Sequence, residues 1–328
     1  MLIASTPQTT LSDVLNARLV RYADLRPCIN AFIDARSPGS DKKENFTIIG
    51  PGVAENPNQY VHIAEPHGFN IGAARQPPHC TNSLHSHDSA EVFIIHTGQW
   101  RFFWGEDGKD GEVFLNPGDT ISIPIHVFRG FENIGATTGF MFAVLGGDDP
   151  GRVHWAPHVI ERARGYGLVL LENGALIDTT LGETVPEGAS VVHPATRAEI
   201  AYIRVPTRAE MHSRVVAHNA LQSRSHEGIT ESIIIDDGNT VAAIATSVVP
   251  HGFTISHMHL AAGAQTLRNT RDCAEVLLVH AGCVTWDNDA GQRIALHAGD
   301  TFTVPRGMSR QLSATAQTEL FVVRGIAG

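Results

Sequence analysis

Two histidines and one glutamate near residue 90 have the types and spacing to bind a metal ion. His85 and His87 are separated by one residue, and Glu91 follows four residues later. If this segment is extended, His85 and His87 point to the same face, because side chains of a strand alternate between faces. Asp88 and Ser89 indicate a short turn that leads to Glu91. Two imidazoles and one carboxylate suit Fe(II), with Mn(II) or another divalent ion as the alternative.

The three side chains belong to a longer pattern. Glu91 is followed seven residues later by Gly98, then by Pro117-Gly-Asp119 and by Pro124. This pattern resembles that of the cupin superfamily, whose fold is a small double-stranded β-helix barrel with a metal at its centre. The resemblance implies one divalent metal per chain at the two histidines and the glutamate. Fe(II) is favoured, with Mn, Ni or Zn as alternatives.

The second half of the cupin pattern is altered in this sequence. The usual Pro-x-Gly-x-x-His-x-x-x-Asn runs here from Pro124 to Asn133, with His126 in place of the glycine and Arg129 in place of the metal histidine. A three-ligand site and an empty, vestigial site therefore both remain open. His126 would face away from Arg129 on a strand, but a turn could bring it in as an extra ligand.

Arg129 has two interpretations. As a structural residue it would neutralise Glu91, because a buried carboxylate needs a partner or a proton. As a catalytic residue it would lie beside the metal and bind the carboxylate or enolate of a substrate through its planar guanidinium. We predict the second role, a clamp for a small-molecule anionic substrate.

The sequence contains the same domain twice. Pro66–Phe69, which reads Pro-His-Gly-Phe, recurs as Pro250–Phe253 at an offset of 184 residues. The Ala-Glu-Val around Glu91 recurs at the same offset, which then falls to 181, so that Arg310 matches Arg129. A fixed offset over so many residues predicts one repeated unit, and the resemblance then implies a bicupin.

The second copy lacks the metal ligands of the first. Asn269 and Arg271 stand where the first copy has His85 and His87, whereas Glu275 is retained. We therefore expect at most one tightly bound metal per chain.

His257 and His259 form another His-x-His, which complicates this expectation. The ungapped repeat places them opposite Ala73 and Arg75 rather than opposite the metal ligands. We expect them to line a pocket or pack in the core, with metal binding as the alternative.

The expected fold is all-β: two tandem double-stranded β-helix (cupin) barrels, a short N-terminal helical arm and a mixed connector. We place the arm at residues 1–44, the first barrel (the metal-binding candidate) at 45–150, the connector at 151–228 and the second, degenerate barrel at 229–328. Recurring apolar residues predict a helix over Thr10–Leu25. In the connector we expect a helix over Pro157–Gly165 and a hairpin around Asn173-Gly174.

Length and composition fit a globular protein of two domains. The 328 residues are 42% hydrophobic and 18% charged. The net charge of -10 argues against nucleic acid or an anionic membrane surface as a partner. No apolar run reaches the length of a membrane span, and the N-terminus lacks the pattern of a signal peptide. Four cysteines without paired spacing do not suggest a disulfide scaffold, so we expect a cytoplasmic protein.

These observations predict a metal-dependent bicupin enzyme. A dioxygenase-type oxidoreductase acting on a small aromatic or oxo-acid anion is the leading hypothesis, in a homodimer or higher homo-oligomer. One alternative is a redox-neutral isomerase, decarboxylase or lyase that uses the same metal. The other is a non-catalytic bicupin that binds a small molecule and has lost its metal.

Overall fold

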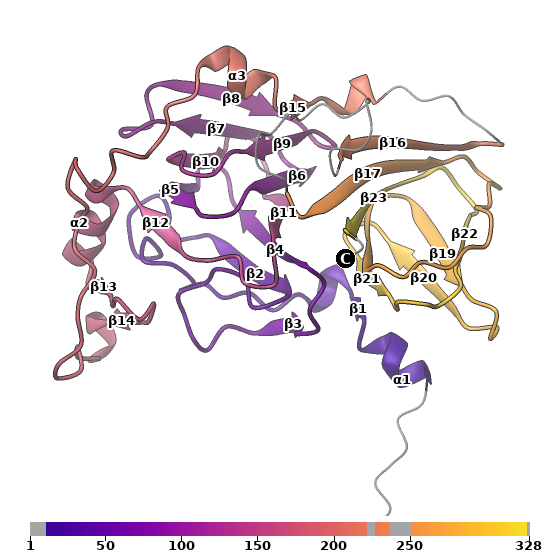
Figure 1. The fold of residues 1–328 in the computed structure, drawn as a ribbon, viewed down its shortest axis with the longest axis horizontal. Helices are drawn as coiled ribbons and strands as arrows, with labels where there is room; N and C mark the ends of the chain where they lie inside the picture. The colour runs from indigo at the N-terminus through magenta and orange to yellow at the C-terminus, as the bar shows by residue number, and fades with distance from the viewer. Residues whose placement is uncertain (1–10, 222–226, 237–250, 327–328) are drawn as a thin grey trace, which may run out of the picture. The chain divides into compact units, whose positions relative to one another are not determined.

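The computed structural model describes residues 11–221, 227–236 and 251–326, and most of their regular structure is β-strand (Figure 1). The chain divides into two compact units. The first unit comprises the described residues of Arg26–Gln222 and Ile233–Thr254. The second unit comprises those of Met1–Leu25, Ser223–Ser232 and Ile255–Gly328. The predicted all-β fold is confirmed.

The first unit contains two large sheets. Their strands are β2 Glu44–Ile49, β3 Val61–Ile63, β4 Phe69–Gln76, β5 Thr81–His87, β6 Glu91–Thr97, β7 Trp100–Trp104, β8 Gly111–Leu115, β9 Thr120–Ile123, β10 Arg129–Asn133, β11 Gly139–Gly146, β12 Val153–Trp155 and β15 Val215–Val216. Within the described residues, one sheet has the order β15-β9-β6-β11-β4-β2-β3 and the other the order β12-β5-β10-β7-β8. Except for the parallel pair β2 and β3, neighbouring strands are antiparallel.

Aromatic and branched side chains from both sheets form the core of the first unit. Strand β7 shows the alternation that this requires, because Trp100, Phe102 and Trp104 are fully buried while the residues between them are partly exposed. The ring of Phe93 on β6 packs 5.0 Å from Phe102 and 5.3 Å from Phe131, measured between ring centroids. This packing holds β6, β7 and β10 in a rigid frame.

The connector adds an apolar layer beside β12, where Figure 1 shows helix α2 and the hairpin β13–β14. Its elements are α2 Pro157–Gly165, β13 Leu168–Leu170, β14 Leu176–Asp178, the 3-10 turn Thr179–Leu181, α3 Arg208–His212 and the 3-10 turn His218–Ala220. The predicted helix and hairpin are confirmed. Trp155, Val159 and Leu168 pack in one buried cluster with Ile33 and Leu84. The connector thus contributes to the frame that surrounds β5.

The second unit repeats the first with fewer strands. The strands that lie wholly or mostly in it are β1 Leu19–Val20, β16 Ile229–Ile235, β17 Phe253–Leu260, β18 Glu275–Ala281, β19 Cys283–Asp287, β20 Arg293–His297, β21 Thr301–Val304, β22 Gln311–Ala314 and β23 Thr318–Gly325. Among the described residues they form the sheets β1-β21-β18-β23-β17-β16 and β20-β19-β22. The counterpart of β5 is reduced to isolated bridges, Gln265 with Ser313 and Asn269 with Arg310.

The N-terminal arm is not one long helix. Helix α1 spans Leu11–Asn16, and β1 and the 3-10 turn Tyr22–Asp24 follow it. The predicted helix over Thr10–Leu25 is therefore wrong beyond Asn16, and Thr10 lies outside the described residues. Leu19 and Val20 pair with β21 instead, so tertiary pairing overrides a helical pattern of apolar residues.

The arm has a counterpart in the connector that the sequence did not reveal. α1, β1 and a 3-10 turn pack on the second unit, and α3, β15 and a 3-10 turn pack on the first. Asp300 Oδ1 accepts a hydrogen bond from Tyr22 N at 3.1 Å, and Asp119 Oδ1 accepts one from His218 N at 2.8 Å. The structural repeat is therefore longer than the sequence repeat.

Candidate metal centre

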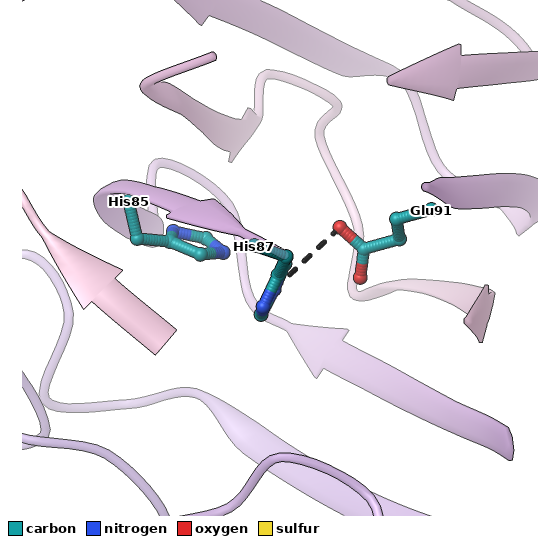
Figure 2. A group of neighbouring side chains, drawn as sticks. All are labelled: His85, His87 and Glu91. Carbon is teal, nitrogen blue, oxygen red and sulfur yellow. Dashed lines mark ion pairs between the residues drawn. The ribbon is translucent and has the colours of Figure 1, made fainter. Parts of the chain in front are cut away.

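His85, His87 and Glu91 converge in the first unit (Figure 2). The histidines lie on β5 one residue apart, and Glu91 begins β6 after a short turn. One donor atom from each side chain lies within 4.8 Å of the other two, and all three residues are buried. His87 Nε2 and Glu91 Oε2 are 3.9 Å apart. The strand alternation inferred from the sequence therefore brings these three side chains together.

Backbone carbonyl groups orient the two imidazoles. His85 Nδ1 lies 2.7 Å from the carbonyl oxygen of Ser83, and His87 Nδ1 lies 3.3 Å from that of Arg152. We assign the ring proton to Nδ1 in both, because a carbonyl oxygen can only accept. Each Nε2 then carries a lone pair, which is the form that ligates a metal.

Electrostatics also favour neutral imidazoles. Burial lowers the pKa of His85 and of His87 well below the ordinary value, and the positive charge of Arg129 lowers both further. Two neutral imidazoles and a carboxylate form the donor set of 2-His-1-carboxylate metal sites. These residues fit a divalent metal ion.

Arg129 lies on β10, opposite His85 on β5. Its Nη2 donates to Glu91 Oε2, and its Nη1 donates to the carbonyl oxygen of His85 at 2.8 Å. Burial raises the pKa of Glu91, and the guanidinium of Arg129 opposes that rise. These contacts are the ones expected of Arg129 as the ion-pair partner of Glu91.

A small apolar cavity borders the three candidate ligands. It has a volume of about 80 Å³, and Arg129 is not one of its lining residues. Most of its wall is apolar, with Phe32, Phe93 and Trp155 among the aromatic members. The side-chain amide nitrogen of Asn45, another lining residue, is buried and has no hydrogen-bond partner among the described residues.

His126 lies outside this group. It occupies the turn before β10 with a φ of 58°, and its Nε2 is 3.9 Å from Asp88 Oδ1. Its ring packs against Tyr202 with a centroid separation of 4.7 Å. The turn that we considered is thus present, but it directs His126 toward Asp88 rather than toward His85 and His87.

No protein-family model matches the sequence, and the search of curated proteins found no match. Solved structures do match over most of the chain. Oxalate decarboxylase from Lactobacillus farciminis, solved as a formate complex, is 12% identical and gives a TM-score of 0.56, with 94% of this chain and 85% of that chain covered. Vicilin from hazelnut, Corylus avellana, gives 0.52 at 14% identity with coverages of 94% and 85%.

Salicylate 1,2-dioxygenase from Pseudoaminobacter salicylatoxidans, solved with gentisate, is 16% identical and gives a TM-score of 0.51. The match covers 79% of this chain and 68% of that chain. The protein has the bicupin fold. At these identities the similarity shows the fold alone, and function must be argued from the site.

In the second barrel of this bicupin, arginines surround the retained glutamate. Glu275 accepts hydrogen bonds from Arg310 at 2.5 and 2.7 Å and from Arg324 at 2.8 Å. Arg271 Nε lies 3.3 Å from the same carboxylate. The pKa of Glu275 is lowered, because the hydrogen bonds and charge of its arginine partners outweigh its burial. Positive side chains therefore balance this carboxylate.

The remaining histidine pair of the bicupin is on β17. His257 is buried, with its Nε2 3.3 Å from Glu319 Oε2 on the neighbouring strand β23 and its ring against Phe321. His259 is partly exposed. Glu275 pairs with arginines rather than with either histidine.

Trp155 and Glu55 were missed by the sequence analysis. Trp155 pairs with His85 across β12 and β5, and their ring centroids are 5.2 Å apart. Glu55 Oε1 accepts a hydrogen bond from Trp155 Nε1 at 2.6 Å. Burial raises the pKa of Glu55 to about 8. Both residues lie outside the cupin pattern, so no spacing in the sequence pointed to them.

The four cysteines of this bicupin are all free. Among residues 11–221, 227–236 and 251–326, there is no helix with the length and apolar character needed to cross a membrane.

Proposed function

We propose that the protein is an Fe(II)-dependent dioxygenase whose substrate is an oxo-acid anion. The observation that carries this proposal is the convergence of His85, His87 and Glu91 on one point beside an apolar cavity. Two histidines and one carboxylate leave coordination positions free, which is the arrangement of non-heme Fe(II) oxygenases. A divalent ion held there would supply Lewis acidity and a template for substrate and O2.

The protein's own residues would orient the acid and exclude water. His85 and His87 present their Nε2 lone pairs because carbonyl groups hold Nδ1. Arg129 is a positioning residue in this proposal, since its guanidinium binds Glu91 and does not line the cavity. The unpartnered amide of Asn45 supplies a donor near the cavity, and a bound carboxylate would satisfy it.

Cavity size supports an oxo-acid over an aromatic acid. An engineered cavity of roughly 150 Å³ binds benzene in another protein. The cavity beside His85 measures about 80 Å³, which suits the carboxylate and oxo groups of an oxo-acid but is small for an aromatic ring.

Oxygen uptake by the iron-loaded protein tests the proposal. Protein reconstituted anaerobically with Fe(II) is exposed to O2 with 2-oxo acids and with aromatic acids, while O2 uptake and CO2 release are measured. We expect substrate-dependent O2 uptake that His85→Ala abolishes and that His158→Ala, a change at an exposed position of α2, leaves intact. CO2 release without O2 uptake would replace the dioxygenase with a redox-neutral decarboxylase. Absence of metal binding would leave a non-catalytic binder.

A further inference from the structure

A second cavity adjoins the metal cavity in the first unit. We call it the outer cleft; it has a volume of about 920 Å³. Residues 52–57 and 151–155, the hairpin β13–β14 and parts of 192–202 form its wall. Six residues line both spaces: Gly52, Val53, Ala54, Gln59, Val153 and Trp155. The metal cavity and the outer cleft are therefore separated by a thin, shared wall.

The shared wall is held by a few hydrogen bonds. Glu55 Oε1 accepts from Trp155 Nε1 at 2.6 Å, and Glu55 Oε2 accepts from the backbone N of Ile33 at 2.7 Å. The backbone N of Gly52 donates to Asn70 Oδ1 at 2.9 Å. Residues 50–59 form no helix or strand. Because strand pairing does not fix this segment, it can adjust around a ligand that extends through the wall.

The two spaces differ greatly in what they can hold. About 80 Å³ beside His85 and His87 accommodates little more than an acid group and an oxo group. The outer cleft lies within the roughly 300–1,000 Å³ range of pockets for drug-sized ligands. A ligand that fills both would have a small head and a much larger body.

The lining of the outer cleft disfavours a second anionic group. Among the described residues that line it, Arg152 is the only arginine or lysine, and its Nη1 donates to the backbone carbonyl of Glu172 at 2.8 Å. Four acidic residues line the same cleft: Glu55, Asp149, Glu172 and Glu199. Burial raises the pKa of Glu55 to about 8, so the negative charge of the lining at neutral pH comes from Asp149, Glu172 and Glu199. Like charges repel across a cleft of this size.

The remaining lining suits an uncharged group. Apolar side chains such as Ile160, Leu170 and Ile200 offer contact surface. Tyr202 and Asn173 offer hydrogen-bonding groups in the same cleft.

We propose that the substrate has two parts, an acidic head in the metal cavity and a larger uncharged body in the outer cleft. This inference rests on the proposed function, which places the acid at His85, His87 and Glu91. The outer cleft is then a substrate subsite, and the substrate extends past the segment around Ala54 from the outer cleft into the metal cavity. The substrate class is an oxo-acid that carries a long or bulky uncharged substituent.

Binding of a homologous acid series tests this proposal. Calorimetry on Mn(II)-loaded protein compares unbranched 2-oxo acids from pyruvate to 2-oxodecanoate. We expect affinity to rise by about fourfold for each methylene group that reaches the outer cleft. A 2-oxo dicarboxylate of the same length should bind more weakly than the monocarboxylate, because its far end meets the acidic lining.

Two variants test whether the rise in affinity with chain length arises in the outer cleft. Ala195 lines the outer cleft and not the metal cavity, so Ala195→Trp should remove the chain-length gain and leave pyruvate affinity unchanged. The matched control is Ala136→Trp, at an exposed turn residue that lines neither space. It should keep the gain.

The outcomes separate this inference from the proposed function. Pyruvate binding without a chain-length gain, or a gain that survives Ala195→Trp, overturns the two-part substrate and leaves the proposed function standing. Failure of the protein to bind Mn(II) or pyruvate at all overturns both.

Discussion

Arg129 and Glu91 form a buried ion pair in which the glutamate is also a candidate metal ligand. The second barrel has the equivalent pair, Arg310 and Glu275, without the two histidines. A buried carboxylate needs a positive partner in either case. In the first barrel a metal and one arginine can share that role, whereas in the second barrel several arginines have taken it over.

Metal stoichiometry is the first prediction. We expect one tightly bound divalent ion per chain, because the first barrel brings the two histidines and the glutamate of the cupin pattern together, whereas the second barrel has Asn269 and Arg271 in place of the histidines. Elemental analysis of the purified, reconstituted protein measures the ratio. A ratio of two metal ions per chain would indicate a second site, with His257 and His259 as its candidate ligands.

Removal of either histidine ligand should release the metal. His85→Ala and His87→Ala are each expected to weaken metal binding by at least about 100-fold, because even indirect partners of a ligand contribute 10–100-fold. The barrel should stay folded, since the substitutions leave its core of Trp100, Phe102 and Trp104 unchanged. Metal titration and circular dichroism measure the two effects. Unchanged metal affinity in both variants would disprove the ligand assignment.

Loss of Arg129 should destabilise the metal-free protein and much less the metal-loaded one. Arg129→Gln leaves the buried Glu91 without its partner, which costs about 3–5 kcal/mol. A divalent ion bound by Glu91 would replace the missing positive charge. Thermal unfolding with and without Mn(II) measures the difference.

Arg310→Gln is the control for that experiment. Arg324 and Arg271 remain beside Glu275, so the loss of stability should be smaller and independent of metal. If Arg129→Gln instead leaves stability unchanged and abolishes only acid binding, Arg129 is the substrate clamp that the sequence suggested.

The side chain of Asn45 should contribute to the affinity for the acid and not to the affinity for the metal. Its buried amide nitrogen lacks a partner among the described residues, so a bound acid is the group that it would serve. Asn45→Leu keeps the approximate volume and removes the donor. We expect pyruvate affinity to fall about tenfold, as for one lost hydrogen bond to a charged group. Manganese affinity should be unchanged, and an unaltered pyruvate affinity would exclude this role.

Buried His251 should make the free energy of unfolding decrease as the pH falls. Burial lowers its pKa to about 4, and its Nε2 lies 2.8 Å from Ser122 Oγ. An unfolded chain protonates histidine near pH 6.5, so between pH 6.5 and 4 the unfolded state binds a proton that the folded state does not. The stability contributed by neutral His251 is thus present above pH 6.5 and is lost as the pH falls toward 4.

The variant His251→Gln isolates this effect. Between pH 7 and pH 5 the wild type should lose about 2 kcal/mol of unfolding free energy through His251, and the variant should lack that loss. Urea denaturation at the two pH values measures it, with the exposed His158→Gln as the control. Equal pH dependence in wild type and His251→Gln would show that His251 is protonated in the folded state.

The sequence by itself determined the repeated all-β fold and the three residues of the candidate metal centre. Both follow from local rules: alternation along a strand puts His85 and His87 on one side, and a fixed offset between similar segments marks a repeat. The sequence repeat also showed that Asn269 replaces His85 in the second copy. The structure agrees with this alignment, because Asn269 pairs with Arg310 as His85 pairs with Arg129.

Tertiary structure decided what surrounds the metal centre. Trp155 and Glu55 reach the region of His85 from segments far away in the chain, and no local pattern encodes such contacts. Leu19 and Val20 are a second example, because their spacing in the sequence predicted a helix but they pair with the distant strand β21. Spacing fixes which side chains share a face, whereas packing of distant segments decides which groups meet them and how much room remains for a substrate.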